Sequence, residues 1–477
     1  MAAHGGRSAA SAEIAALETR RAKQVVPFDR LRLDLAARAA EHGLTPDLVD
    51  DLLGSERARQ ARVPAHLSLD LTEQVSTFGR AEVLQALAAA QPTGARVVEL
   101  EALAAQALAD PEFVGLRQAA AKAGVVETRY TTRELLDTEA ELLGGARRRR
   151  HERVARVHAF SLRDQLRDSS LSDEQRDVVR RLCGDGEGVA VIRAAAGTGK
   201  TFTLEAARQA WEDSGHRVVG CALSARAALE LEDSAGIPSV TIAAAKRSLD
   251  TGHGLPFDGV LVVDEAGMVG TRDLARLSEA ADFFHTKLVL VGDDRQLPEI
   301  QAGGAFHRLA EELDSLELTE VRRQHHAWDR DALDALRNGD VERWARAYRA
   351  HGKLTVAENA RDARAALVND WSRAPGEAIM IAARRADVRD LNDGARELLK
   401  VEGRLGGDEL EAGGRAFTEG DEVIGLRNDR KLGILNGQRG TVRQVDRVRH
   451  TLTIVLGGGR RVRVGSGYLD DGHLDHG

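Results

Sequence analysis

The stretch VIRAAAGTGKTFTLEAA at residues 191–207 constrains the fold most strongly, because a β-branched run enters a glycine-rich turn and leaves it as a helix. The pattern G-x-x-x-x-G-K-[ST] is typical of a loop whose backbone N–H groups wrap phosphates while its lysine neutralises them. Ala194 stands where that pattern begins with glycine, which is tolerable at negative φ. We therefore predict a strand, a phosphate-binding loop and a helix whose positive N-terminal end faces an anion.

Five consecutive residues of this loop are expected to hold a nucleoside triphosphate: Gly197, Thr198, Gly199, Lys200 and Thr201. The glycines allow close approach to the phosphates, the lysine lies on the β and γ phosphates, and the Thr201 hydroxyl is a ligand for Mg²⁺. The alternative is an ordinary strand-to-helix turn with an exposed lysine, which the surrounding motifs disfavour. The sequence predicts binding of ATP or GTP with Mg²⁺.

A second motif, GVLVVDEAGMV at 259–269, predicts a buried strand with Asp264 and Glu265 at its C-terminal tip. Such a tip adjoins the phosphate site of a parallel sheet. Asp264 is the expected partner of Mg²⁺, directly or through water, and Glu265 the base or orienter of the attacking water. A solvated turn is the alternative for an isolated acidic pair.

Two further segments offer groups for the γ-phosphate. KLVLVGDDRQLPEIQAGGAF at 287–306 predicts another buried strand, followed by Gln296 as an amide that senses this phosphate. LELTEVRRQ at 316–324 supplies Arg323 as a charge stabiliser. Taken singly, these residues would be a loop glutamine and an exposed arginine.

Together, AAGTGKT, VVDEAGMV, GDDRQLPEIQAGGAF and LTEVRRQ resemble motifs I to IV of RecD-like superfamily 1 DNA helicases, and more closely the helicase portion of MobF/TraA-type conjugative relaxases. The resemblance covers most of residues 60–477. It implies an ATP-dependent motor that moves 5′ to 3′ on single-stranded DNA in plasmid transfer, with other conjugation or relaxosome proteins as possible partners. It also implies that Gln175 contacts adenine, although Ser172 and Gln175 equally fit a helix capping box.

The family's motifs V and VI normally follow the segment that ends at Gly477 here, so the sequence resembles a motor truncated before them. We expect slow hydrolysis without unwinding, unless Arg384 or Arg385 supplies the missing arginine. The alternative function is an ATP-binding, DNA-binding remnant without productive unwinding. No three-histidine cluster of a relaxase domain is visible among the 15 histidines.

The predicted fold class is α/β, a P-loop NTPase with a RecA-like parallel sheet. Residues 1–60 form a helical lead-in, 61–165 a helical N-terminal domain, and 166–330 the first RecA-like lobe. Residues 331–416 begin a second lobe, in which 377–398 are expected to form a strand and then a helix. Residues 417–477 form an SH3-like β-barrel insertion and tail, with a turn at Asn436-Gly437.

DNA contacts are assigned by weaker signals. Arg147 to Arg150 either track a DNA backbone or form a solvated helix face. The hydroxyls of Ser224 and Thr241 either contact the phosphates of single-stranded DNA or cap helices. In the β module, the candidate phosphate contacts are Arg427, Arg430, Lys431 and Arg439.

The composition indicates a globular protein without a membrane span, but it does not identify what the protein binds. The chain of 477 residues has 43% hydrophobic and 30% charged residues, and no apolar run long enough to cross a bilayer. Its N-terminus lacks the apolar core of a secretory signal, and its two cysteines have no metal-binding spacing. We expect a cytoplasmic protein without a membrane partner. A net charge of −8 leaves a local DNA-binding groove possible.

Overall fold

The computed structural model describes residues 36–43, 45, 48, 61–91, 94–120, 126–167, 169–293, 296, 301–374, 378–429 and 431–477. These residues divide into two compact units, one ending at Phe113 without the segment Leu71–Phe78, and one containing that segment and Val114–Gly477. Most of the predicted lead-in, 1–60, lies outside the described residues, apart from a helical stretch at 36–41.

The described elements of the first unit are helices, while the bounds 61–165 of the predicted helical domain stay a prediction. In this unit α5 packs against α6, and Glu82 and Glu99 accept hydrogen bonds from the backbone at the N-termini of these two helices. The predicted helical domain, however, also contains a two-stranded hairpin that the sequence analysis did not anticipate. The elements up to residue 151 are α4 (Leu67–Leu71), α5 (Arg80–Ala89), α6 (Val97–Leu108), β1 (Phe113–Ala120), β2 (Val126–Thr132), α7 (Arg133–Arg148) and η2 (Arg149–His151).

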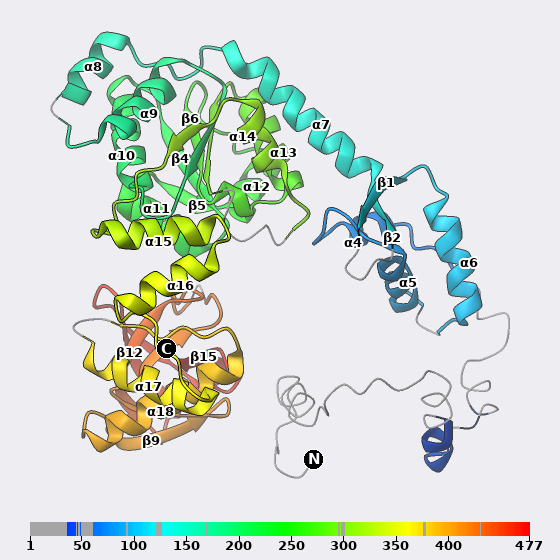
Figure 1. Cartoon of the computed structure of the whole chain (residues 1–477), viewed down its shortest axis with the longest axis vertical. Helices are drawn as coiled ribbons and strands as arrows, with labels where there is room; N and C mark the ends of the chain where they lie inside the picture. The colour runs from blue at the N-terminus through cyan, green and yellow to red at the C-terminus, as the bar shows by residue number, and fades with distance from the viewer. Residues whose placement is uncertain are drawn as a thin grey trace. The chain divides into compact units, whose positions relative to one another are not determined.

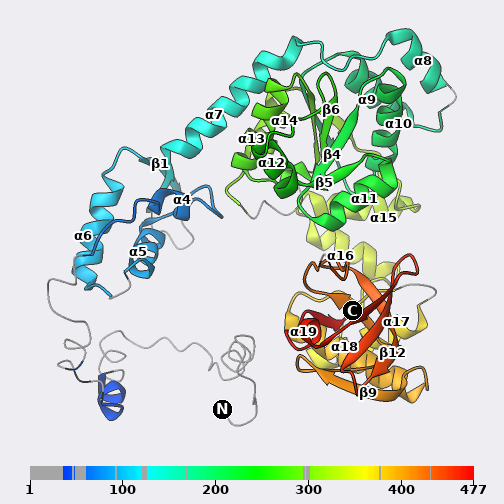
Figure 2. The same cartoon turned by 180° about the vertical axis from the view of Figure 1, so that it is seen from behind.

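The centre of the second unit is a six-stranded sheet of order β5-β4-β6-β7-β3-β8 in which every neighbouring pair is parallel. Helices cover both faces, with α9, α10 and α11 on one side and α12, α13 and α14 on the other (Figures 1 and 2). The predicted P-loop α/β fold is therefore confirmed. Its elements are α8 (Ala159–Arg167), α9 (Asp173–Gly184), β3 (Val189–Ala194), α10 (Lys200–Asp213), β4 (Val218–Ala222), α11 (Ala225–Ala235), β5 (Ser239–Thr241), α12 (Ile242–Asp250), β6 (Val260–Val263), η3 (Ala266–Met268), α13 (Thr271–Phe283), β7 (Lys287–Gly292), α14 (Ala305–Glu312) and β8 (Leu316–Leu318).

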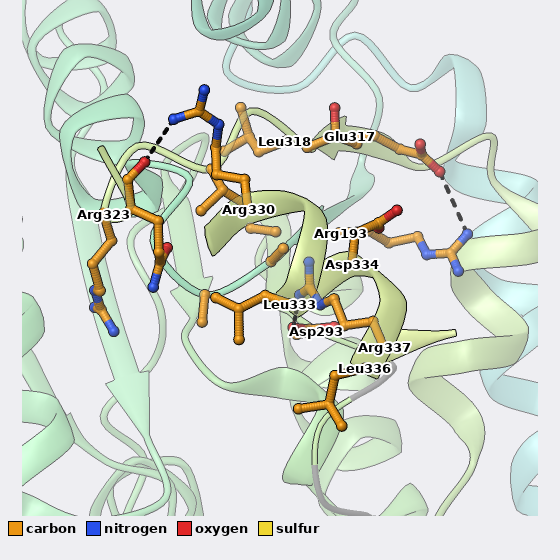
Figure 3. A pocket seen from close by; sticks show the side chains of 16 residues that line it. Arg193, Asp293, Glu317, Leu318, Arg323, Arg330, Leu333, Asp334, Leu336 and Arg337 are labelled. Carbon is orange, nitrogen blue, oxygen red and sulfur yellow. Dashed lines mark hydrogen bonds and ion pairs between the residues drawn. The ribbon is translucent and has the colours of Figure 1, made fainter. Parts of the chain in front are cut away.

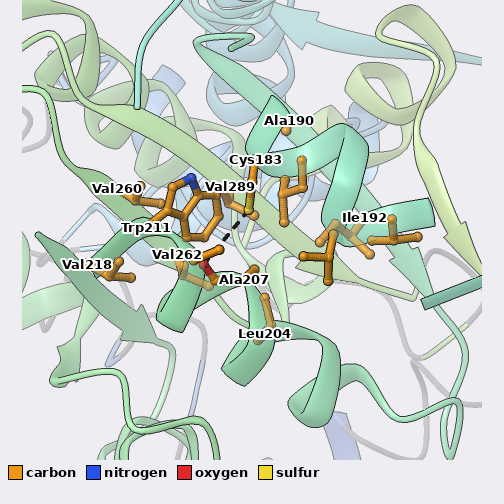
Figure 4. Packing of buried hydrophobic residues seen from close by; sticks show 14 of the residues in the cluster. Cys183, Ala190, Ile192, Leu204, Ala207, Trp211, Val218, Val260, Val262 and Val289 are labelled. Atoms are coloured by element: carbon orange, nitrogen blue, oxygen red, sulfur yellow. Dashed lines mark hydrogen bonds between the residues drawn. The ribbon is translucent and has the colours of Figure 1, made fainter. Parts of the chain in front are cut away.

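Helices bury the sheet on both faces, and each strand contributes to both cores because its successive side chains point to opposite sides. In β3, Ala190 and Ile192 join the core beneath α9, α10 and α11, whereas Val189 and Val191 join the core on the other face. The first core also contains Trp211 (Figure 4). Its indole N–H donates to the Ala155 carbonyl at 3.0 Å. Both cysteines are buried here: Cys183 in the first core and Cys221 in the second.

Two charged side chains are buried near the N-terminal ends of the sheet's strands. Lys287, 1% exposed, begins β7 and donates to the Glu187 carbonyl at 2.7 Å. Arg149, 3% exposed, donates to the Thr286 carbonyl and to Glu152, each at 2.7 Å. These bonds offset only part of the cost of removing two cations from water, because the Arg149 Nη1 is buried without a hydrogen-bond partner among the described residues and burial lowers the pKa of Lys287.

After the parallel sheet, the chain forms helices and then an antiparallel β module. The strand predicted near 377 is wrong: residues 378–384 contain no strand, and Ile379 and Ile381 are exposed because no neighbouring strand pairs with them. The predicted helix is α18. The helices are α15 (Ala327–Arg337), α16 (Val341–Ala350), α17 (Ala360–Arg373) and α18 (Arg385–Val401).

The predicted C-terminal β module is present but begins earlier than residue 417. A β9–β10 hairpin starts at Gly406, and a five-stranded antiparallel sheet has the order β14-β13-β12-β11-β15. Alternating residues of β13 and β14 fill its core. The elements are β9 (Gly406–Ala412), β10 (Arg415–Glu419), β11 (Glu422–Gly425), β12 (Arg439–Asp446), β13 (Thr451–Leu456), β14 (Arg461–Val464), α19 (Ser466–Leu469) and β15 (Leu474–His476).

Candidate nucleotide site

The four predicted motor motifs follow four adjacent strands of the parallel sheet, β6, β7, β3 and β8. The carboxyl ends of parallel strands meet at one edge of a sheet, which is where α/β proteins bind ligands. The acidic pair, the Gln296 segment, the glycine-rich loop and the Arg323 segment therefore lie side by side. Segments that lie more than a hundred residues apart in the sequence therefore meet at one edge of the sheet.

The glycine-rich loop has the backbone conformation that its glycines permit. Gly197 and Gly199 have φ of 83° and 80°, values that L side chains rarely adopt. A Cβ on Gly197 would come within 2.8 Å of the Arg323 Cβ, and one on Gly199 would overlap the Gln175 amide nitrogen. Ala194 is the last residue of β3 and is not among the described residues with positive φ, so alanine is tolerated there. The loop is a cradle with no space for further side chains.

Gln175 lies beneath this loop and is 1% exposed. Its Oε1 accepts from the Ser172 N–H at 3.0 Å, and the Ser172 hydroxyl accepts from the Gln175 N–H at 3.2 Å, which is the capping box of α9. Its Nε2 donates to the Thr198 carbonyl at 3.2 Å. The side chain therefore both caps a helix and supports the loop, while its contact with adenine stays a prediction.

Lys200 begins α10 and faces the two acids predicted to work with it. Its Nζ lies 2.8 Å from Asp264 Oδ1 and 2.8 Å from Glu265 Oε1. Burial lowers the pKa of Lys200, but the charges and hydrogen bonds of the two carboxylates outweigh burial, so the pKa lies above its usual value. A fixed ammonium at the mouth of a phosphate cradle is suited to binding an anion. Thr201, the next residue, is half-buried at the same helix end.

The acidic pair occupies a tightly packed turn. Glu265 has φ of 52°, an uncommon left-handed conformation for glutamate, and its N–H is bound to Asp264 Oδ1 at 2.9 Å. The following helical turn η3 packs against the end of β7, since a Cβ on Gly292 would meet the Gly267 nitrogen at 2.7 Å. The position of Glu265 is thus fixed by the backbone on both sides.

The two predicted γ-phosphate groups lie at the edges of this site. Gln296 is exposed, and its Nε2 is 3.5 Å from Asp293 Oδ2, while residues 294–295 and 297–300 lie outside the described part of the chain. Arg323 is also exposed, and its N–H donates to the Gly197 carbonyl at 3.3 Å. Backbone contact therefore attaches the Arg323 segment directly to the glycine-rich loop.

A pocket of about 390 Å³ lies between the start of this loop and helix α15 (Figure 3). Sequence motifs missed its α15 wall, because the only signal is the helical spacing of Arg330, Leu333, Asp334 and Arg337. Gln324 also lines it, with a buried Oε1 for which the described residues offer no hydrogen-bond partner. The remaining lining residues are Arg193, Ala194, Ala195, Ala196, Asp293, Glu317, Leu318, Thr319, Val321, Arg323 and Leu336.

The structure changes the interpretation of the arginine run at α7 and η2. Arg149 is buried, and Arg147 and Arg150 form ion pairs with Glu312 and Asp314 at 2.7 and 2.5 Å. A solvated face is therefore wrong for Arg149, and three of the four arginines attach this segment to the lobe. Burial in particular removes Arg149 from any DNA contact.

Other predicted DNA contacts stay predictions. The hydroxyls of Ser224 and Thr241 cap α11 and α12 by accepting from N–H groups three residues on. In the β module, Lys431 is exposed, Arg427 binds His473, and Arg439 has a buried Nε with no partner among the described residues. Arg430 lies outside the described residues.

Fold and site together define a P-loop NTPase, and residues 170–359 match the family described as an AAA domain. Over 95% of its length the chain is 36% identical to a probable conjugal transfer protein TraA of Sinorhizobium fredii, and it spans 40% of that relative. It is 28% identical to the ATP-dependent RecD2 DNA helicase of Deinococcus radiodurans over 59% of this chain and 39% of that one. These similarities support the resemblance to RecD-like superfamily 1 helicases of the TraA type that the motifs indicated.

Among solved structures, Bacteroides Pif1 bound to single-stranded DNA is similar over 62% of this chain and 74% of that one, with 19% identity and a TM-score of 0.40. No helix in the described ranges is both long and apolar enough to cross a membrane.

Proposed function

We propose that this chain hydrolyses ATP with Mg²⁺ and uses the energy to move 5′ to 3′ along single-stranded DNA during conjugative transfer, in the cytoplasm and alongside relaxosome proteins. The observation that carries the proposal is the position of the Lys200 ammonium, 2.8 Å from each of two carboxylates at the tip of β6 and at the mouth of a glycine cradle. The direction and the process rest on the resemblance to TraA and RecD proteins.

The cradle fits a triphosphate because Gly197 and Gly199 give the loop left-handed turns that a residue with a Cβ, which would collide with Arg323 or Gln175, rarely adopts. The N–H groups of the loop would bind phosphate oxygens at the positive end of α10, and that of Thr198 would exchange the Ala195 carbonyl, at 3.3 Å, for a phosphate oxygen. Lys200 would exchange its carboxylate partners for the β and γ phosphates. The Thr201 hydroxyl and the Asp264 carboxylate would hold Mg²⁺, which neutralises charge on the transferred phosphoryl group when bound.

Glu265 is proposed to take the proton of the attacking water. Its fixed left-handed backbone aims the carboxylate at Lys200, and hence at the expected phosphate position. Gln296 would orient the γ-phosphate and Arg323 would stabilise the charge that develops on it. Gln175 would hold the loop through Thr198 as well as contact adenine.

The test compares steady-state ATPase of the chain, with and without oligo(dT), to that of Glu265→Gln. We expect stimulation of the unchanged chain by oligo(dT). For the variant we expect retained ATP binding but turnover reduced by about 10² or more, since an amide cannot accept the proton. Glu279→Gln, on the exposed face of α13, is the matched control and should behave like the unchanged chain.

Undiminished turnover in Glu265→Gln would contradict the assignment of the base. For direction, displacement of streptavidin is compared on single-stranded oligonucleotides with biotin at the 5′ or the 3′ end, and displacement from the 5′ end alone would contradict the proposed polarity. Absence of any stimulation by oligo(dT) would contradict the motor function itself.

A further inference from the structure

Helix α15 contacts both segments expected to touch the γ-phosphate, the one that bears Gln296 and the one that bears Arg323. One side of the helix lines the pocket with residues spaced i, i+3, i+4 and i+7, a spacing that places them on a single face: Arg330, Leu333, Asp334 and Arg337. The two arginines are two helical turns apart. Figure 3 shows them pointing from the same helix toward different partners.

Arg337, in the last turn of α15, forms an ion pair with Asp293 directly after β7. Its Nη2 lies 3.0 Å from Asp293 Oδ2, and the aspartate side chain is only 7% exposed. The same oxygen lies 3.5 Å from the Gln296 Nε2. A charge-assisted bond to a nearly buried carboxylate is strong and directional, so Arg337 fixes the group that the Gln296 amide approaches.

Arg330, in the first turn of α15, holds the other segment. Its Nη1 donates to the carbonyls of Gln324 and His325 at 2.8 and 3.1 Å. These residues directly follow Arg323, whose own N–H is bound to the Gly197 carbonyl. The chain segment bearing Arg323 is thus held between the glycine-rich loop and α15.

Packing of the helix does not require these arginines. Ala332 and Ala335 are 2% and 5% exposed and provide α15 with a buried apolar face of its own. Exposed arginine–carboxylate pairs contribute little to stability, but Asp293 is nearly buried and both arginines bind loops of the site. Their placement is better explained by control of those loops than by attachment of the helix.

We propose that Arg337 is a positioning residue for ATP hydrolysis: through Asp293 it sets the position of Gln296, and with Arg330 it makes α15 a strut that places Gln296 and Arg323 together against the γ-phosphate. This inference rests on the proposed function, because it presupposes nucleotide at the glycine-rich loop. It predicts that loss of Arg337 impairs recognition of the third phosphate alone.

The test measures the affinities of AMP-PNP and ADP, each with Mg²⁺, by titration calorimetry, and the thermal midpoint, for Arg337→Gln. We expect AMP-PNP affinity to fall about tenfold, as for loss of one charge-assisted hydrogen bond, with ADP affinity unchanged. kcat for ATP should fall with it. Arg337→Lys retains the charge and should restore part of both, and it takes the place of the glutamine variant if that variant does not fold.

Arg396→Gln is the matched control, because it breaks a pair between an arginine and a buried aspartate, Asp421, at 2.8 Å in the C-terminal module. It should lower the thermal midpoint without changing the ratio of AMP-PNP to ADP affinity. If Arg337→Gln leaves the ratio of AMP-PNP to ADP affinity unchanged, whether neither affinity falls or both fall equally, the inference is overturned. Failure of the unchanged chain to bind either nucleotide would instead overturn the proposed function.

Discussion

Substitution of Gly199 by alanine tests whether the glycine-rich loop and Gln175 are one energetic unit. A residue with a Cβ at φ of 80° costs about 1–2 kcal/mol. The new Cβ would also overlap the Gln175 amide nitrogen, which is 1% exposed and has no open space to enter. Displacing that amide removes its hydrogen bond to the Thr198 carbonyl, worth about 1 kcal/mol. We expect Gly199→Ala to lower the free energy of unfolding by about 2–3 kcal/mol.

A double-mutant cycle separates the two contributions. In a Gln175→Ala background the overlap is relieved, so Gly199→Ala should cost only the backbone part, about 1–2 kcal/mol. The assay is urea unfolding followed by tryptophan fluorescence, with Trp328, Trp344 and Trp371 replaced by phenylalanine so that the buried Trp211 reports on this lobe. Equal losses in the two backgrounds would refute the contact between loop and glutamine.

Three further predictions concern charged residues. Lys200→Ala should abolish measurable ATP binding and hydrolysis, because it removes the only group described here that pairs with both Asp264 and Glu265; undiminished ATPase would contradict the site. Burial lowers the pKa of Lys287 to about 8 from 10.5, so the folded protein binds fewer protons there than the unfolded chain between these values. Stability should rise with pH across this window by about 3 kcal/mol, and urea unfolding of Lys287→Met should lack that rise. Arg149→Ala should lower the free energy of unfolding by about 2–3 kcal/mol, whereas Arg148→Ala, at an exposed neighbour, should change it by less than about 0.5 kcal/mol; equal effects would contradict the burial of Arg149.

The P-loop lobe could be predicted from sequence because its signals are local and mutually consistent. Apolar runs identify β3, β6 and β7, which lead into the glycine-rich loop, the acidic pair and a glycine, and parallel pairing then brings their ends together without further information. The role of Lys200 follows from one motif. Its two carboxylate partners follow from a second.

What could not be predicted depends on tertiary partners. The apolar residues Ile379 and Ile381 resemble a strand, but a strand exists only where another pairs with it. The arginine run resembles a solvated face, yet the Thr286 carbonyl and Glu152 allow Arg149 to be buried. Arg337 has no motif at all, and its partner Asp293 lies 44 residues away in the chain.

Burial of both thiols has a practical consequence for measuring motion. Burial raises the pKa of Cys183 and of Cys221 to about 12, so neither is a reactive thiolate at neutral pH. Maleimide dyes should therefore not label either cysteine of the folded chain. A single surface cysteine, such as Glu279→Cys on α13, would be the one labelled position without any prior removal of native cysteines, which makes the chain suited to single-molecule fluorescence on DNA.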